Sequence, residues 1–203
     1  MEPRLTKKEE ALIRETIRNK YSQVAAASPG SYFRYPTGAE GLRRQRYPLD
    51  LMRDFPKSLI ESFCGVGNPF SLGPIHPGEA VLDIGCGAGL DTLLAAKMVG
   101  PEGRVAGLDA TPGMIEKARA HAALLALPNV TFQVGEAESL PFPDNDFDVI
   151  ISNGVFNLTL DKEKALKESH RVLKPGGRFM LADMVLVAAL PPEKAGKIEN
   201  WYQ

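Results

Sequence analysis

The chain has 203 residues, of which 44% are hydrophobic, enough for one domain with a proper core and an extension. Its formal net charge of −1 argues against a strongly basic nucleic-acid or membrane partner surface. The two cysteines, Cys64 and Cys86, form neither a disulfide framework nor a metal-ligand spacing. No signal peptide or long apolar run is visible, so we expect a cytoplasmic protein with no metal site.

Residues 1–79 are predicted to form an N-terminal helix followed by an irregular segment. Thr6 and Glu9 make a capping-box pattern, and apolar residues then recur at helical spacing up to Ser28-Pro-Gly30. Residues 31–79 mix aromatic side chains with arginines, which can stack on nucleic acid. The neutral charge and the lack of an RNA-binding motif argue against that partner. Because residues 31–60 have no regular period and many aromatic side chains, our hypothesis is that they close over the ligand as a lid.

Residues 80–203 follow a regular alternation of strands and helices and are predicted to be the ligand-binding domain. Thr111 is expected to cap a helix that starts at Pro112. The pattern predicts an α/β fold with a parallel sheet. The expected strands are 80–84, 104–109, 130–134, 147–152 and 178–187, and the expected helices are about 90–98, 112–126 and 161–173.

A glycine-rich turn follows the first of these strands. Gly85, Gly87 and Gly89 alternate there, and they allow unusual dihedrals and close approach of a ligand to the backbone. Dinucleotide-binding turns have the different spacing G-x-G-x-x-G and hold a pyrophosphate. Because Asp83 and Asp91 flank this turn and would repel a diphosphate, a ligand with an adenosine and a charged amino acid fits better.

About 25 residues later, Asp109 ends the second strand, where an acid can bind ribose hydroxyls. Together with Asp83–Gly89, this residue resembles the S-adenosylmethionine site of class I methyltransferases. The resemblance implies a Rossmann-like three-layer sandwich around a mostly parallel sheet, with S-adenosylmethionine as cofactor. It implies nine cofactor-binding residues: Asp83, Gly85, Gly87, Gly89, Asp109, Ala110, Glu136, Ala137 and Asn153. Of these, Asp109 is assigned to the ribose hydroxyls, Glu136 and Ala137 to the adenine edge, and Asn153 with the glycine turn to the methionine moiety. Tyr21 either touches the cofactor or packs in the core.

Residues 60–200 resemble the arsenite methyltransferases in particular and, more loosely, the quinone C-methyltransferases. The shared segments include Gly65-Val-Gly-Asn-Pro69 and Ser152-Asn-Gly-Val-Phe-Asn-Leu158. That family holds As(III) through thiolates at the positions occupied here by Val66 and Gly154, and Cys64 lies two residues from the first. Because a soft metalloid needs sulfur ligands, we expect methyl transfer to another small molecule.

No general base is nominated, since His76, His121 and His170 are interpreted as surface or packed residues. The rival hypothesis is a non-catalytic S-adenosylmethionine-binding subunit that needs a partner chain.

The end of the chain carries a further expectation. Class I methyltransferase sheets usually have seven strands in the order 3-2-1-4-5-7-6, whereas this sequence stops at Gln203, inside the helix expected after strand five. The fold is therefore expected to be truncated after strand five. Its edge would be covered by a second copy, a partner, the N-terminal segment or residues after 187. A UGA selenocysteine codon read as a stop is one hypothesis for this ending, beside a trimmed or naturally short chain.

Overall fold

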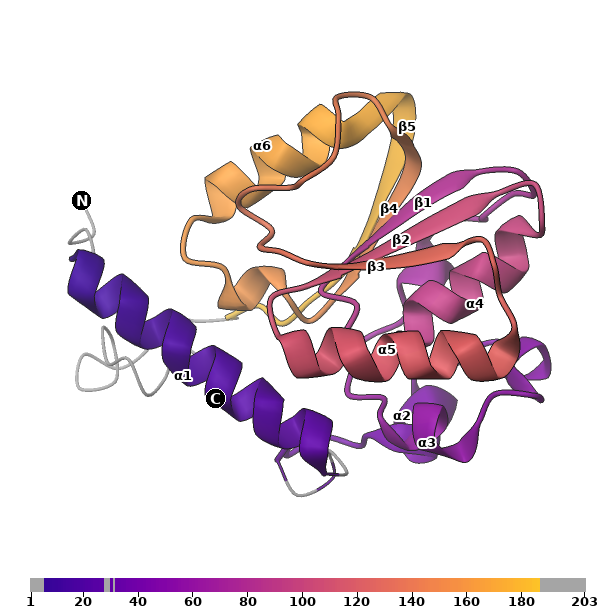
Figure 1. Ribbon diagram of the computed structural model, residues 1–203, viewed down its shortest axis with the longest axis horizontal. Coiled ribbons are helices and arrows are strands. Elements are labelled where there is room, and N and C mark those ends of the chain that lie inside the picture. Colours follow the sequence, from indigo (N-terminus) through magenta and orange to yellow (C-terminus); the bar gives the residue numbers. More distant parts are fainter. Residues whose placement is uncertain (1–5, 28–29, 31, 187–203) are drawn as a thin grey trace.

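The computed structural model describes residues 6–27, 30 and 32–186. Five parallel strands form one sheet in the order β3-β2-β1-β4-β5 (Figure 1). The central strands are nearly continuous apolar runs, as expected for parallel strands buried on both faces. Their bounds are β1 Ala80–Ile84, β2 Arg104–Asp109, β3 Val130–Val134, β4 Phe147–Asn153 and β5 Leu173–Ala182.

Helices cover both faces of this sheet, which confirms the three-layer prediction. Figure 1 shows α4 (Leu90–Val99) and α5 (Pro112–Leu125) on one face and α6 (Lys162–Val172) on the other. These bounds lie within one or two residues of those predicted. Thr111 occupies the N-cap position of α5, but its side chain makes no capping hydrogen bond, in contrast to the expectation.

The N-terminal helix α1 (Lys7–Ala26) runs beside α5 along one side of the domain (Figure 1). Its predicted capping box is confirmed, since the Thr6 hydroxyl accepts from the Glu9 amide and the Glu9 carboxylate accepts from the Thr6 amide. No helix within the described ranges is both long enough and apolar enough to cross a membrane.

The segment after α1 is more ordered than its sequence indicates. It forms α2 (Gly38–Arg44), η2 (Leu49–Met52), α3 (Lys57–Glu61) and η3 (Pro69–Leu72). Its apolar side chains, including Leu42, Met52, Phe55 and Leu59, are buried with Leu93 of α4 in one core cluster. These residues therefore belong to the hydrophobic core, while the lid role of residues 31–60 and the division of the chain at residue 79 stay predictions.

Strand β5 begins and ends earlier than the predicted strand at residues 178–187. Leu173 already pairs with Phe147, and after an irregularity the ladder continues from Arg178 to Ala182. Ala182 pairs with Asn153, the last residue of β4, so no partner strand is left beyond it. β5 lies at one edge of the described sheet. The predicted helix after strand five falls on residues 187–203, which lie outside the described residues.

Candidate functional site

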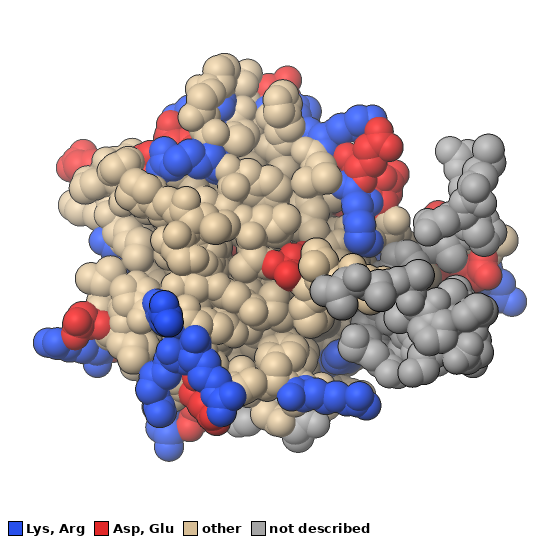
Figure 2. All heavy atoms as spheres, turned by 180° about the vertical axis from the view of Figure 1, so that it is seen from behind, with Lys and Arg blue, Asp and Glu red and all other residues tan. Residues whose placement is uncertain are grey.

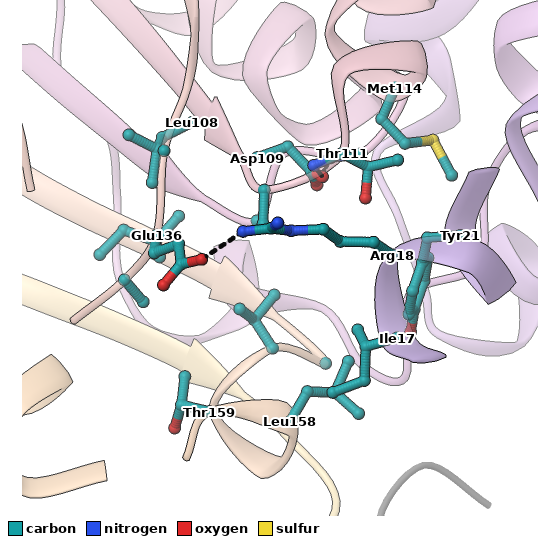
Figure 3. A pocket seen from close by; sticks show the side chains of 18 of the residues that line it. Ile17, Arg18, Tyr21, Leu108, Asp109, Thr111, Met114, Glu136, Leu158 and Thr159 are labelled. Atoms are coloured by element: carbon teal, nitrogen blue, oxygen red, sulfur yellow. Dashed lines mark hydrogen bonds and ion pairs between the residues drawn. The ribbon is translucent and has the colours of Figure 1, made fainter. Parts of the chain in front are cut away.

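A cavity opens at the carboxyl ends of β1, β2 and β4, where parallel sheets bind their ligands. Residues from α1 form the opposite wall, and Figure 3 shows Ile17, Arg18 and Tyr21 facing Asp109 and Glu136 across it. Seven of the nine residues predicted to bind the cofactor line this cavity: Gly85, Gly87, Asp109, Ala110, Glu136, Ala137 and Asn153.

The glycine turn is held in place by the carboxylate of Asp109. One carboxylate oxygen accepts from the Gly87 amide at 2.9 Å and the other from the Thr111 amide at 2.8 Å. Burial raises the pKa of this carboxyl above its usual value, although the two amide donors oppose the shift. Gly87 has a φ of +52° and open space where a Cβ would lie, so the backbone itself faces the cavity.

Two arginines of α1 reach across the cavity to the residues that follow β3. Arg18 donates to Glu136 at 2.6 Å, drawn as the dashed line in Figure 3. Arg14 pairs with the same carboxylate and also with Glu138 at 3.3 Å. Sequence analysis missed both arginines, although their spacing of four residues places them on one helix face. This face of α1 is therefore the cover of the cavity.

A second, smaller cavity lies along the glycine turn and is lined by Asp83 and Asp91. Asp83 accepts from the Thr92 hydroxyl at 2.6 Å. Asp91 accepts at its Oδ2 atom from Tyr47 and Asn153, each at 3.1 Å, while its buried Oδ1 atom has no hydrogen-bond partner. Burial raises the pKa of Asp91 to about 6 and that of Asp83 well above its usual range.

The hydrogen bonds that Asp91 accepts from Tyr47 and Asn153 oppose the rise in its pKa and favour its ionised form. A buried carboxylate with one unpaired oxygen beside a cavity is suited to a cationic donor such as an ammonium group. From the sequence, Asp91 was predicted only to repel a phosphate. Its place beside the smaller cavity was not predicted, because its partner Tyr47 is distant in sequence.

Asn153 is fixed by a set of hydrogen bonds rather than left free to turn. Its carbonyl accepts from the amides of Val66 at 2.8 Å and Gly67 at 3.2 Å. Its amide donates to Tyr47 at 2.9 Å and to the Gly67 carbonyl at 2.8 Å. Asn153 therefore ties the end of β4 to the loop at residues 64–67, and it borders both cavities.

The other two predicted cofactor-binding residues, Asp83 and Gly89, do not line the larger cavity. Asp83 lines only the smaller cavity, and Gly89 lines neither. Gly89 is the N-cap residue of α4, with a φ of +94°, and a Cβ there would lie 3.1 Å from Ala118. Tyr21 lines the larger cavity and also packs against the core cluster of Val24, Ala88 and Met114, so both of its predicted roles stay open.

The two positions that resemble arsenic-binding thiolate positions adjoin in space. A Cβ placed on Gly154 would lie 3.3 Å from Cγ1 of Val66. Cys64 borders both cavities, and burial raises the pKa of its thiol to about 12. In the described part of the chain, no three His, Cys, Asp or Glu side chains gather closely enough to hold a metal ion.

Comparison with known families and sequences agrees with this geometry. Residues 75–203 match the family described as "Methyltransferase domain". The chain is 37% identical to an arsenite methyltransferase of Halobacterium salinarum, covering 89% of this chain and 49% of that protein. It is 43% identical to a demethylmenaquinone methyltransferase of Symbiobacterium thermophilum, covering 52% of this chain and 42% of that protein.

Among solved structures, the fold resembles an arsenic(III) S-adenosylmethionine methyltransferase from Chlamydomonas reinhardtii. The TM-score is 0.65 at 36% identity, covering 80% of this chain and 54% of that one. The chain therefore spans about half the length of the curated relatives it matches.

Proposed function

Because the chain belongs to the methyltransferase domain family, whose Rossmann-like members use S-adenosylmethionine, we propose that it transfers a methyl group from this cofactor to a small molecule. The observation that carries the proposal is the pair of adjoining cavities at the strand ends. One has Asp109 beside apolar walls, and the other has Asp91 with an unpaired buried oxygen.

The residues present fit the three parts of this cofactor. Leu108 and Ala137 offer an apolar slot for the adenine, and Asp109 has lone pairs left for the ribose hydroxyls. Asp91 supplies a carboxylate for the ammonium of the methionine moiety, and Asn153 keeps that carboxylate in position. Glu136 can bind the edge of the adenine after its ion pairs with Arg14 and Arg18 of α1 have rearranged.

S-adenosylmethionine brings an electrophilic methyl group on a sulfonium, so the protein has little covalent chemistry to perform. Its work is to align the acceptor with the methyl group and to exclude water. Tyr21 and Cys64 border the cavity and are suited to this enclosure. No general base is assigned to the reaction.

A small organic acceptor fits the site better than nucleic acid or arsenite. On the face shown in Figure 2, basic side chains lie among acidic ones around the margin, and the middle is largely uncharged. In the arginine-rich segment, Arg44 pairs with Glu40 and Arg53 pairs with Asp50. Val66 and Gly154 offer no sulfur to a metalloid, so the acceptor is proposed to be a thiol or a quinone-like ring.

A turnover assay with purified protein tests this function. We expect S-adenosylhomocysteine to form with at least one of a panel of thiols and quinones, and no product to form with arsenite. Binding of S-adenosylmethionine without turnover on any acceptor would instead support the alternative of a non-catalytic subunit that needs a partner.

The position of β5 supports the alternative of a subunit that needs a partner chain. This strand ends the described sheet, and exposed apolar side chains follow it at Met184, Val185 and Leu186. Open strand edges are normally paired or covered, so we propose that a second copy or a partner chain covers this one. Light scattering that finds a monomer, together with rapid hydrogen exchange along β5, would contradict it.

A further inference from the structure

The glycine turn is held from two sides, and only one of them belongs to the cofactor site described above. On the cavity side, Asp109 accepts from the Gly87 amide. On the opposite side, the imidazole of His121 lies 2.9 Å from the carbonyl of Ala88, the next residue of the turn. His121 belongs to α5, is 3% exposed, and lines neither cavity.

The partners of His121 define its tautomer. A carbonyl only accepts, so Nδ1 must carry the hydrogen that the Ala88 carbonyl receives. The other ring nitrogen, Nε2, lies 3.1 Å from the Ser58 hydroxyl of α3 and accepts its hydrogen when the ring is neutral. Burial lowers the pKa of His121 and so favours this neutral form.

We infer that His121 is a positioning residue for the cofactor: it anchors the glycine turn through the Ala88 carbonyl, and Ser58 orients its ring. Ala88 lies between Gly87 and Gly89, whose φ angles of +52° and +94° require the turn to be held in an unusual conformation. An anchored carbonyl keeps the neighbouring amides aimed at the ligand before it arrives. The inference rests on the proposed cofactor site and adds a residue outside it.

Side-chain isosteres separate anchoring from simple packing. In His121→Asn the side-chain amide takes the place of Nδ1 and keeps a donor for Ala88. In His121→Gln the amide reaches the place of Nε2 near Ser58 and loses the donor to Ala88. We therefore measure the Kd for S-adenosylhomocysteine by calorimetry and the thermal midpoint without ligand, for both variants and for Ser58→Ala.

The expected Kd of His121→Asn is within about twofold of the wild type, whereas His121→Gln binds about three- to tenfold more weakly, as one lost neutral hydrogen bond would give. Ser58→Ala is expected to lie between them, and it keeps the test decisive if a His121 variant does not fold. Equal Kd values for Asn and Gln, or losses of affinity that simply follow the thermal midpoint, would overturn the inference.

Hydrogen exchange of the turn amides provides a readout that needs no ligand. The Gly87 amide donates to Asp109 and the Gly89 amide donates to the Cys86 carbonyl. Their protection should fall in His121→Gln and return in His121→Asn. If wild-type protein does not bind S-adenosylhomocysteine, the proposed function fails, while this exchange pattern still decides the role of His121. Unchanged protection in both variants counts against it.

Discussion

The guanidinium of Arg18 lies 2.6 Å from the carboxylate of Glu136, so that a helix from the start of the chain is joined to the far side of the candidate cofactor cavity. The Arg18 side chain is 49% exposed, and such partly exposed ion pairs contribute about 0.2–1 kcal/mol. The pair can therefore open without unfolding the domain. We predict that Arg18→Gln raises the association rate of S-adenosylhomocysteine by up to about fivefold, as stopped-flow fluorescence would report.

Arg53→Gln is the matched control for this measurement. Arg53 also pairs with a carboxylate, Asp50, but neither residue lines the cavity. Its association rate should equal that of the wild type. An unchanged rate in Arg18→Gln at low salt would show that this ion pair by itself does not limit entry, since Arg14 still pairs with Glu136.

Asp109 is expected to dominate the affinity for the cofactor. Asp109→Ala removes the proposed ribose acceptor and also the acceptor for the Gly87 and Thr111 amides. The predicted loss in S-adenosylmethionine binding is about 1.5–3 kcal/mol, the usual cost of losing hydrogen bonds to a charged group. Calorimetry measures it, and NAD serves as the comparison ligand. Tighter binding of NAD than of S-adenosylmethionine would contradict the assignment.

Alanine variants of Gly87 and Gly100 distinguish an effect on backbone conformation from an effect on ligand binding. Both have positive φ angles, +52° and +67°, and at both the space that a Cβ would occupy is free of other heavy atoms within 4 Å. An alanine at Gly87 should therefore cost about 1–2 kcal/mol of unfolding free energy. An alanine at Gly100, whose ψ of −172° lies in a region that is essentially restricted to glycine, should cost about 1–3 kcal/mol. Only Gly87→Ala should also weaken S-adenosylhomocysteine binding, because its methyl group would project where the backbone faces the cavity. Similar Kd values for the two variants would refute this distinction.

The prediction about arsenite concerns Val66 and Gly154, which lie next to each other and carry no thiol. Wild-type protein should not methylate As(III) in the presence of S-adenosylmethionine and a thiol reductant. Gly154→Cys alone should not suffice, since φ there is +74° and the new Cβ would press on Val66. Val66→Cys with Gly154→Cys should bind As(III), with Cys64 as a neighbouring third thiol, and Cys64→Ser in that background should weaken binding. Saturable arsenite methylation by the wild type would contradict the prediction.

The sheet and its ligand edge could be predicted from sequence because the determining signals are local. Apolar runs mark β1 and β4, and glycine spacing marks the turn between β1 and α4. Asp109 could be found because parallel strands end at one edge. The bounds of β5 could not be predicted from the sequence, because they depend on where the neighbouring strand β4 ends, at Asn153.

The remaining parts of the site depend on contacts distant in sequence. Arg18 meets Glu136 from another element, and Tyr47 reaches Asp91 from the segment after α1. In that segment the irregular pattern of aromatic residues predicted a lid over the site, which stays a prediction, and it did not predict the short helices. The pattern was irregular because several short helices each bury one or two side chains, such as Leu42 and Leu59, against α4 and α5.

Asp91 makes both the stability and the cofactor affinity depend on pH. Burial raises its pKa from the usual 3.8 to about 6, so between these values the folded protein retains a proton that the unfolded chain has released. The stabilisation is therefore complete below about pH 4 and is lost as the pH rises through about 6, by about 3 kcal/mol at most. Urea unfolding of ligand-free protein should show this fall, and Asp91→Asn should reduce it, whereas the exposed Asp50→Asn should not.

Ligand binding should follow the opposite trend with pH. An ammonium group binds the ionised form of Asp91, so wild-type affinity for S-adenosylhomocysteine should rise as the pH passes through about 6. In Asp91→Asn the affinity should be lower at pH 7 and should depend less on pH in this range than that of the wild type. Calorimetry at several pH values distinguishes the two proteins. Identical pH profiles would show that Asp91 does not bind the ammonium.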